Sequence, residues 1–323
     1  MIRERSHLFA MVVVGLVVVF SAPLWLPRFY VQLLTISLSL GITAMSFILL
    51  AGYGGMISLA QMAFYAMGAY VIGIGTMDLG WPTSLLLPLA VVAAALVAAV
   101  FGAIAIRSRG IYFLMMTLAL SQLFYGVGLE WESVTHGWNG ISGITRPSVF
   151  GHSLLEATPL YYTTLVVTGL CYLLLRRLVH SPFGIALRGI RDNPTRMAAL
   201  GFNVNLYRFL AIVISGAFAG VAGILGVYFS GVISPHTANL SAIVQVLMAA
   251  LIGGVARQEG GLLGALVTVL LVSFTSQYTS RYWMVVGAVF VAAVIFMPNG
   301  LLGAKSFGIP RLKKHRDVSA NES

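Results

Sequence analysis

Charge is scarce in this 323-residue chain: 9% of the residues are Asp, Glu, Lys or Arg, against about a quarter in a typical soluble domain. None of these charges falls near the middle of the long apolar runs that fill the sequence. An ionisable side chain at the centre of a bilayer is costly and usually marks a proton relay, an ion site or a voltage sensor. Their absence argues against a proton-coupled pump.

Other chemistry is missing as well. The one cysteine, Cys171, lies inside an apolar run, so no intrachain disulfide can form. The six histidines are scattered without a metal-ligand spacing such as His-Glu-x-x-His, and no phosphate-binding G-x-x-x-x-G-K-[ST] sequence occurs. Glu130 and Glu132 have no paired acid or base and are expected to be solvated. We therefore expect no enzyme activity, no metal and no cofactor in this chain.

What the sequence has in abundance is long apolar runs, since 59% of its residues are hydrophobic. A helix needs about 20 apolar residues to cross a hydrocarbon core. The runs predict an all-α fold: a polytopic membrane helix bundle of about ten transmembrane spans, which lie near 8–26, 30–50, 56–76, 83–106, 111–129, 159–175, 207–230, 241–256, 261–277 and 282–298.

The basic residues predict the orientation of these spans. With the N-terminus in the cytoplasm, all but Arg28, Arg146 and Arg281 of the 19 lysines and arginines lie inside. Such a bias follows the positive-inside rule and places both termini in the cytoplasm. The net charge of +10 then reflects inside loops that meet anionic lipid headgroups and not a nucleic-acid surface.

This topology divides the chain into two parts. We expect residues 1–303 to form a transmembrane domain, with an outer loop at 130–158 and a long cytoplasmic loop at 176–208, and residues 304–323 to form a basic cytoplasmic tail. The first 26 residues resemble a signal peptide, but bulky Phe20 precedes the possible cut after Ala22. We expect an uncleaved anchor.

A glycine-rich stretch follows the second span. Gly52, Gly54 and Gly55 permit a sharp turn, and the next helix combines small residues with neutral polar ones. Such a stretch can serve tight helix packing alone. It can also border a translocation path, because a backbone break at membrane depth is tolerated only inside protein or beside a cavity. The path residues we predict are Gly52, Tyr53, Gly55, Ser58, Gln61 and Phe64.

The cytoplasmic loop predicts a short helix of its own. Apolar residues with helical spacing are interrupted at Asp192, and Asn193 can cap a new helix that starts at Pro194 and stops at Gly201. An amphipathic helix among arginines has two plausible uses. It can lie on the membrane surface, or it can insert into a groove on a cytoplasmic partner.

In their order along the chain, several segments together resemble the permease subunits of ABC importers for branched-chain amino acids, the leucine, isoleucine and valine type. The resemblance covers nearly the whole length. Its segments are LLAGYGGMISLAQMAFYAMGAY (49–70), RSRGIYFLMMTLALSQLFYG (107–126), the loop 180–208, VISGAFAGVAGILGVYFSGVISP (213–235), LMAALIGGVARQEGGLLGA (247–265) and FMPNGLLG (296–303).

The resemblance implies that the cytoplasmic loop docks on an ATPase. The residues that match the family's coupling pattern are Arg188, Arg191, Asp192, Ala198, Ala199, Gly201 and Asn203. Relatives usually carry a glutamate before the Ala-Ala pair, where this chain has Thr195, Arg196 and Met197. ATP is then used by partner subunits and not by this chain.

The implied assembly lies in the bacterial plasma (inner) membrane. It contains two ATP-binding subunits, a second permease subunit, expected to be a paralogue, and an extracytoplasmic substrate-binding protein. The implied function is translocation of branched-chain or related amino acids. Urea or short-chain amides are the alternative cargo within the family. A secondary transporter or channel is disfavoured because it has no evident need for the basic loop 176–208. A membrane enzyme is disfavoured because the sequence has no acid-base or metal constellation.

Overall fold

The computed structural model describes residues 25–149, 152–153, 157–279, 281–297 and 300–301, together with residues 21 and 23. Over these residues the chain is almost entirely helical, as the sequence predicted. The six longest helices are α2 (Arg28–Ile48), α4 (Thr83–Ala105), α5 (Ile111–Glu130), α7 (Ala157–His180), α10 (Val204–Ser230) and α12 (Gln258–Tyr278).

Shorter elements connect or flank these helices. The shorter helices are α3 (Gln61–Met77), α6 (Glu132–Thr135), α8 (Pro182–Asp192), α9 (Pro194–Ala199), α11 (Leu240–Gly253) and α13 (Tyr282–Phe296). A π-helical turn, η1 (Leu49–Tyr53), extends α2, and the 3-10 turns are η2 (Gly137–Asn139) and η3 (Pro235–Ala238). Two-residue strands form antiparallel pairs, β1 (Ile141–Ser142) with β4 (Val232–Ile233) and β2 (Ser148–Val149) with β3 (His152–Ser153).

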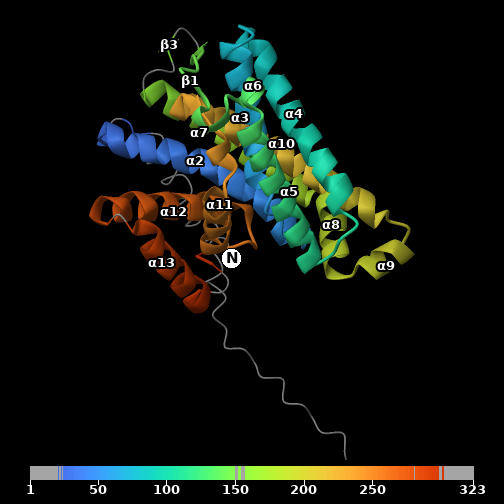
Figure 1. Cartoon of the computed structure of the whole chain (residues 1–323). Coiled ribbons are helices and arrows are strands. Elements are labelled where there is room, and N and C mark those ends of the chain that lie inside the picture. The colour runs from blue at the N-terminus through green and yellow to red at the C-terminus, as the bar shows by residue number, and fades with distance from the viewer. Residues whose placement is uncertain are drawn as a thin grey trace, which may run out of the picture.

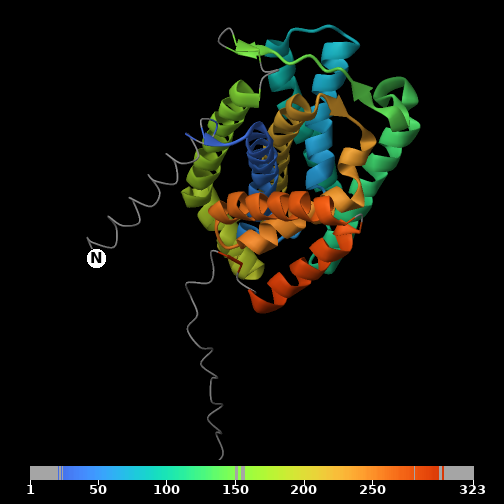
Figure 2. The same cartoon turned by 90° about the vertical axis from the view of Figure 1, so that its left-hand side faces the viewer.

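Helix α2 forms the centre of the bundle. It packs against α7, α10, α11 and α12, and Figure 2 shows it with α7 on one side and α3 on the other. Of its most apolar stretch 78% is buried, against 28% for α5 and 33% for α12. Helices α12 and α13 form a V at one edge of the bundle (Figure 1). The outer helices therefore keep apolar side chains for contact with lipid or other membrane chains.

Small residues allow the close crossing of α3 and α10. A side chain at Gly68 would overlap the backbone of Gly220, and one at Gly223 would overlap the carbonyl group of Tyr65. Without a strong hydrophobic drive between helices in lipid, close backbone contact of this kind is a main source of helix association. The glycines of the segment 213–235 thus serve packing.

The predicted spans are confirmed in part. Six helices are long and apolar enough to cross a membrane: α2, α4, α5, α7, α10 and α12. The span predicted at 56–76 starts later, because residues 54–60 are irregular and α3 begins at Gln61. Helices α11 and α13 are shorter than the six. The first predicted span and the tail lie largely outside the described residues, so the count of ten and the cytoplasmic termini stay predictions.

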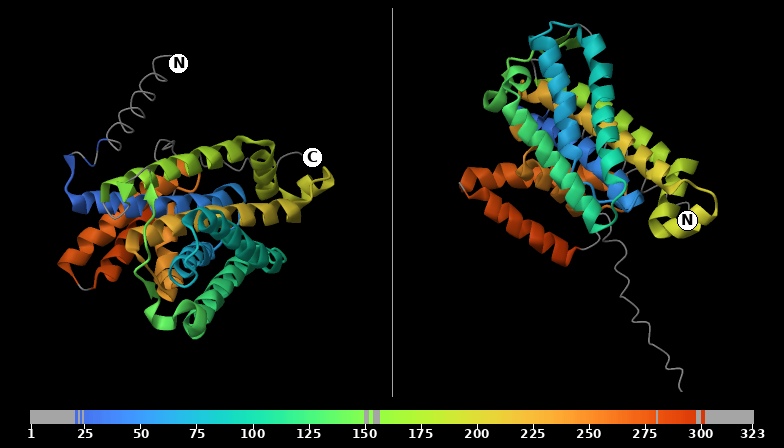
Figure 3. Two further views of the ribbon diagram at one scale, coloured as in Figure 1. Left: turned by 90° about the horizontal axis from the view of Figure 1, so that it is seen from above. Right: turned by 45° about the vertical axis from the view of Figure 1, so that its right-hand side comes forward.

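The two ends of the bundle differ in character. Helices α8 and α9 project at one end (Figures 1 and 3). The end of α3 at Met77, helix α6 and the small strands lie at the other end, beside exposed Trp81, Trp131 and Trp138. The sequence predicted the basic end to be cytoplasmic and the aromatic end to lie outside, and this orientation stays a prediction.

Candidate functional site

The glycine-rich stretch is a break between two helices, as the sequence predicted. Helix α2 widens into the π-helical turn η1, in which the amide of Gly54 donates to the carbonyl oxygen of Leu49 at 3.2 Å. The chain then reverses through Gly55, whose φ of +65° is a left-handed conformation that favours glycine. Short π-helical segments are frequent at functional sites. This break is the first candidate element.

The break is held from two sides. A side chain at Gly52 would overlap the carbonyl group of Val255, so this position has room for glycine alone. On the other side, the guanidinium group of Arg191 on α8 donates to the carbonyl oxygen of Gly52 and also to Asp192 at 2.9 Å. The guanidinium of Arg188 lies 5.9 Å from the centre of the Tyr53 ring.

The structure thereby brings together two sets of residues that the sequence analysis had kept apart. Arg188 and Arg191 were predicted to contact an ATPase, and Gly52 and Tyr53 to line a path. The helix break and the loop that holds α8 and α9 are neighbours in this fold, and Arg191 is partly engaged within its own chain. No pattern in the sequence signalled this pairing, because a single arginine in a basic loop is unremarkable.

The polar side chain of Gln61 lies inside a hydrogen-bonded network. Its amide nitrogen donates to the hydroxyl of Ser215 at 3.1 Å, and its amide oxygen accepts from the hydroxyl of Ser46 at 3.0 Å. Ser215 also donates to the backbone carbonyl of Ser46 at 2.7 Å. The three residues belong to α3, α10 and α2, and each is at most 2% exposed. The network ties the three helices together.

Ser58 and Phe64 are buried as completely as Gln61. Phe64 is 0% exposed and packs edge-on against Phe101, with ring centres 5.5 Å apart. Ser58 is 1% exposed and, with Gln61, borders a seam between α3 and α11 that has no room for a water molecule. In this conformation the three side chains pack between helices, and the path assignment for them stays a prediction.

The loop between α7 and α10, predicted to be cytoplasmic, folds as two short helices. The side chain of Asn193 accepts from the amide of Arg196 at 2.9 Å, which caps α9, and Gly201 follows it at a φ of +88°. The predicted cap, start and stop of this helix are confirmed. Leu187 and Ile190 of α8 are buried, whereas the described α9 contains no buried residue and Leu200 after it is 67% exposed.

Further arginines lie at the same end of the bundle. Gly55 borders a small cavity of about 40 Å³ that Arg109 and Arg208 also line. Glu259 at the start of α12 accepts a hydrogen bond from the Tyr172 hydroxyl at 2.6 Å. Arg109 and Arg208, both predicted to lie inside, therefore meet beside the helix break.

A sequence profile described as "Branched-chain amino acid transport system / permease component" matches residues 29–296. The chain belongs to this family. The permease is a multi-pass membrane protein and a transport component, not an enzyme. It is the permease component of a branched-chain amino acid ABC transport system.

Curated relatives of the permease include two kinds of protein. LivM of Salmonella typhimurium LT2, named a high-affinity branched-chain amino acid transport system permease protein, is 26% identical over 93% of this chain and 75% of its own length. LivH of Escherichia coli K12, with the same description, is 26% identical over 83% of this chain and 92% of its own length. No solved structure matches the chain.

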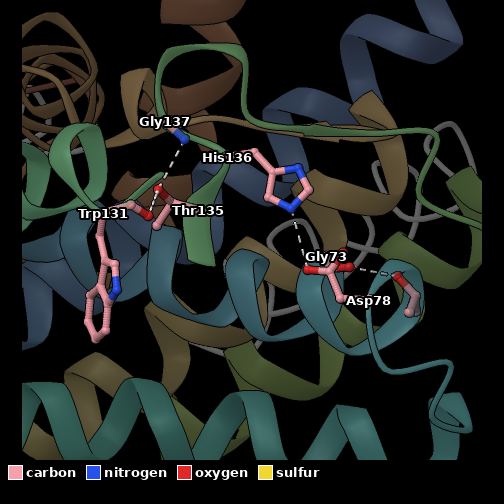
Figure 4. Close-up of polar contacts among 7 residues, drawn as sticks. Gly73, Asp78, Trp131, Thr135, His136 and Gly137 are labelled. Carbon is pink, nitrogen blue, oxygen red and sulfur yellow. Dashed lines mark hydrogen bonds and ion pairs between the residues drawn. The ribbon is translucent and has the colours of Figure 1, made fainter. Parts of the chain in front are cut away.

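At the end opposite α8 and α9, a polar contact holds the loop that follows α5, which was predicted to be an outer loop. The imidazole of His136 lies 3.6 Å from the carboxylate of Asp78 after α3 (Figure 4). The hydroxyl of Thr135 donates to the carbonyl oxygens of Gly128 and Trp131 and accepts from the amide of Gly137. These bonds fix the loop against α3 and α5. Within the described ranges, no three His, Cys, Asp or Glu residues gather as metal ligands.

Proposed function

We propose that this permease forms one half of a translocation unit that imports branched-chain or related neutral amino acids. Two ATP-hydrolysing subunits drive it by contacting α8 and α9, and an extracytoplasmic protein delivers the cargo at the opposite end. The observation that carries the proposal is the hydrogen bond from Arg191 on α8 to Gly52 in the helix break. It joins the loop available to a partner directly to the central helix of the bundle.

The exposure of α9 supports the docking of a partner. An isolated helix of six residues that buries none of its own side chains gains little stability from this chain. Leu200 (67% exposed) and Ile185 (59% exposed) present apolar surface beside arginines. An amphipathic helix that inserts into a groove on another protein uses such a surface.

The relatives support pairing with a different permease chain. Escherichia coli K12 has both LivM and LivH, each named as a permease protein of the high-affinity branched-chain system, and this chain is similar to both. The presence of two such proteins in one organism supports a paralogue as the second permease.

Docking can be tested with one pair of variants. Leu200→Gln is expected to reduce co-purification of co-expressed ATP-binding subunits and to reduce leucine uptake. Leu79→Gln is the matched control, because Leu79 is 53% exposed and follows α3 at the opposite end of the bundle. It should leave co-purification unchanged. Full ATPase association of the Leu200 variant together with normal uptake would show that α9 does not dock.

The cargo is tested in the same cells. Uptake of labelled leucine, urea and a control solute is compared with and without the ATP-binding subunits. Leucine uptake that needs those subunits supports the proposal. Uptake of urea instead of leucine would favour the alternative cargo, and uptake without them would contradict the assembly.

A further inference from the structure

An open cavity of about 330 Å³ lies between α2, α3, α10 and α11. The last turns of α10 and the first turns of α11 line it. It therefore lies in the half of the bundle away from α8 and α9. None of the predicted path residues lines it. Those of its lining residues that matter here are Ser39, Tyr65, Gly226, Ala242 and Gln245.

The lining is neutral throughout. No charged side chain is found among the lining residues, which lie within the described part of the chain and are mostly aliphatic or aromatic. Because an unpaired charge is costly to take out of water, such a cavity excludes charged side chains. Ligand sites of this kind are mostly apolar with a few polar groups, and about 300 Å³ is the lower end of their usual size.

The cavity lining includes the polar side chains of Tyr65, Ser39 and Gln245. A side chain at Gly226 would overlap the hydroxyl of Tyr65, so the Tyr65 ring can form the cavity wall only because residue 226 is a glycine. The Ser39 hydroxyl is already used, since it donates to the carbonyl oxygen of Ala222 at 2.8 Å. Gln245 is half-buried and makes no hydrogen bond to the described residues, which leaves its amide available to a solute.

We propose that this cavity receives the aliphatic side chain of the transported amino acid, while the charged ammonium and carboxylate groups stay towards its open side. The inference rests on the proposed function, because it takes the cargo to be a neutral amino acid. The aliphatic side chain of the cargo then contacts the cavity beside Ala242 and Gln245 and not the buried Gln61 network.

The first test narrows the cavity in the full transport complex. Ala242→Phe is expected to lower the ratio of leucine to valine uptake roughly tenfold, because one methylene group in an apolar pocket can be discriminated by that factor. The matched control is Val244→Phe, which adds a similar ring two residues further along the same helix, outside the cavity lining. The control should keep the original ratio. An unchanged ratio in a normally assembled Ala242 variant overturns the proposal.

The second test does not depend on transport. In a Cys171→Ala background, Ala242→Cys should react with a small water-soluble thiol reagent, and leucine should slow the reaction whereas lysine should not. Val244→Cys is the control for reagent access. Labelling that leucine leaves unchanged would overturn the cavity assignment even if uptake is normal. Absence of branched-chain uptake by the unaltered complex would instead contradict the proposed function, with the cysteine result still deciding the cavity.

Discussion

The guanidinium group of Arg191, at the end of α8, donates a hydrogen bond to the carbonyl oxygen of Gly52, which lies 139 residues earlier in the chain. One partner belongs to α8, in the loop predicted to be cytoplasmic, and the other to the break at the end of the central helix. A displacement of α8 by a docked subunit would pull directly on this break.

Arg191→Ala removes the bond to Gly52. Because the Arg191 side chain is 40% exposed, we expect the bond to Gly52 to contribute about 1 kcal/mol of stabilisation. Its loss should lower leucine uptake roughly fivefold, while the ATP-binding subunits stay bound. Arg177→Ala is the control, since it removes an exposed charge at the end of α7. Equal uptake by the two variants would show that the bond has no part in transport.

Gly55→Ala tests the geometry of the break. Both Gly55 (φ +65°) and Gly80 (φ +60°) have a positive φ, so alanine costs about 1–2 kcal/mol of backbone strain at either position. At Gly55 the new Cβ also lies 2.5 Å from the Cγ atom of Arg191, whereas at Gly80 nothing lies within 4 Å. We therefore expect Gly55→Ala to lower the unfolding temperature and the uptake more than Gly80→Ala does. The excess should vanish when Arg191→Ala is added.

Gln61→Leu tests the buried network. The change removes the side-chain bonds to Ser46 and Ser215, which keep backbone partners of their own. Bonds between membrane helices contribute about 0.6 kcal/mol on average, so assembly should persist. We predict a several-fold loss of leucine uptake. Thr164→Val is the control, because Thr164 is buried on α7 and bonds within its own helix. Normal uptake by the Gln61 variant would assign the network to packing alone.

Substitutions at Gly201 test the end of α9. Alanine adds left-handed strain, whereas proline cannot adopt a φ of +88° and also removes the amide that donates to the Ala198 carbonyl at 3.0 Å. Co-purification of the ATP-binding subunits should fall from glycine to alanine to proline. The unfolding temperature of the membrane bundle should change little in either variant. Equal association in all three proteins would contradict the docking of α9.

Much of the local structure could be predicted from the sequence. The two ends of α9 were predictable from Asn193 and Gly201, because a helix cap and a left-handed glycine fix a helix end through contacts within one helical turn. Among the described residues the apolar runs form six long helices. These were predictable because the length and composition of a helix decide whether it can cross a bilayer. The start of α3 was placed five residues too early, because the extent of the break after Gly55 depends on its tertiary contacts.

The candidate site was predicted less completely. Gln61 was predicted to border the path, and Gln245 was not. Both are neutral polar residues in apolar runs, and the sequence could not distinguish a side chain in a packed network from one beside an open cavity. Polarity is a property of the residue. Whether that polarity is used between helices or left for a solute depends on which helices meet there.

The sequence by itself determined the membrane class, the long helices, the glycine break and the capped loop helix, because each follows from composition or from interactions between near neighbours. Only the tertiary structure decided that Arg191 reaches Gly52, that Gln61 joins α2 to α10, and that a neutral cavity opens beside Ala242. These relationships join residues far apart in the chain. They arise when all the helices pack together, and no periodicity within one segment records them.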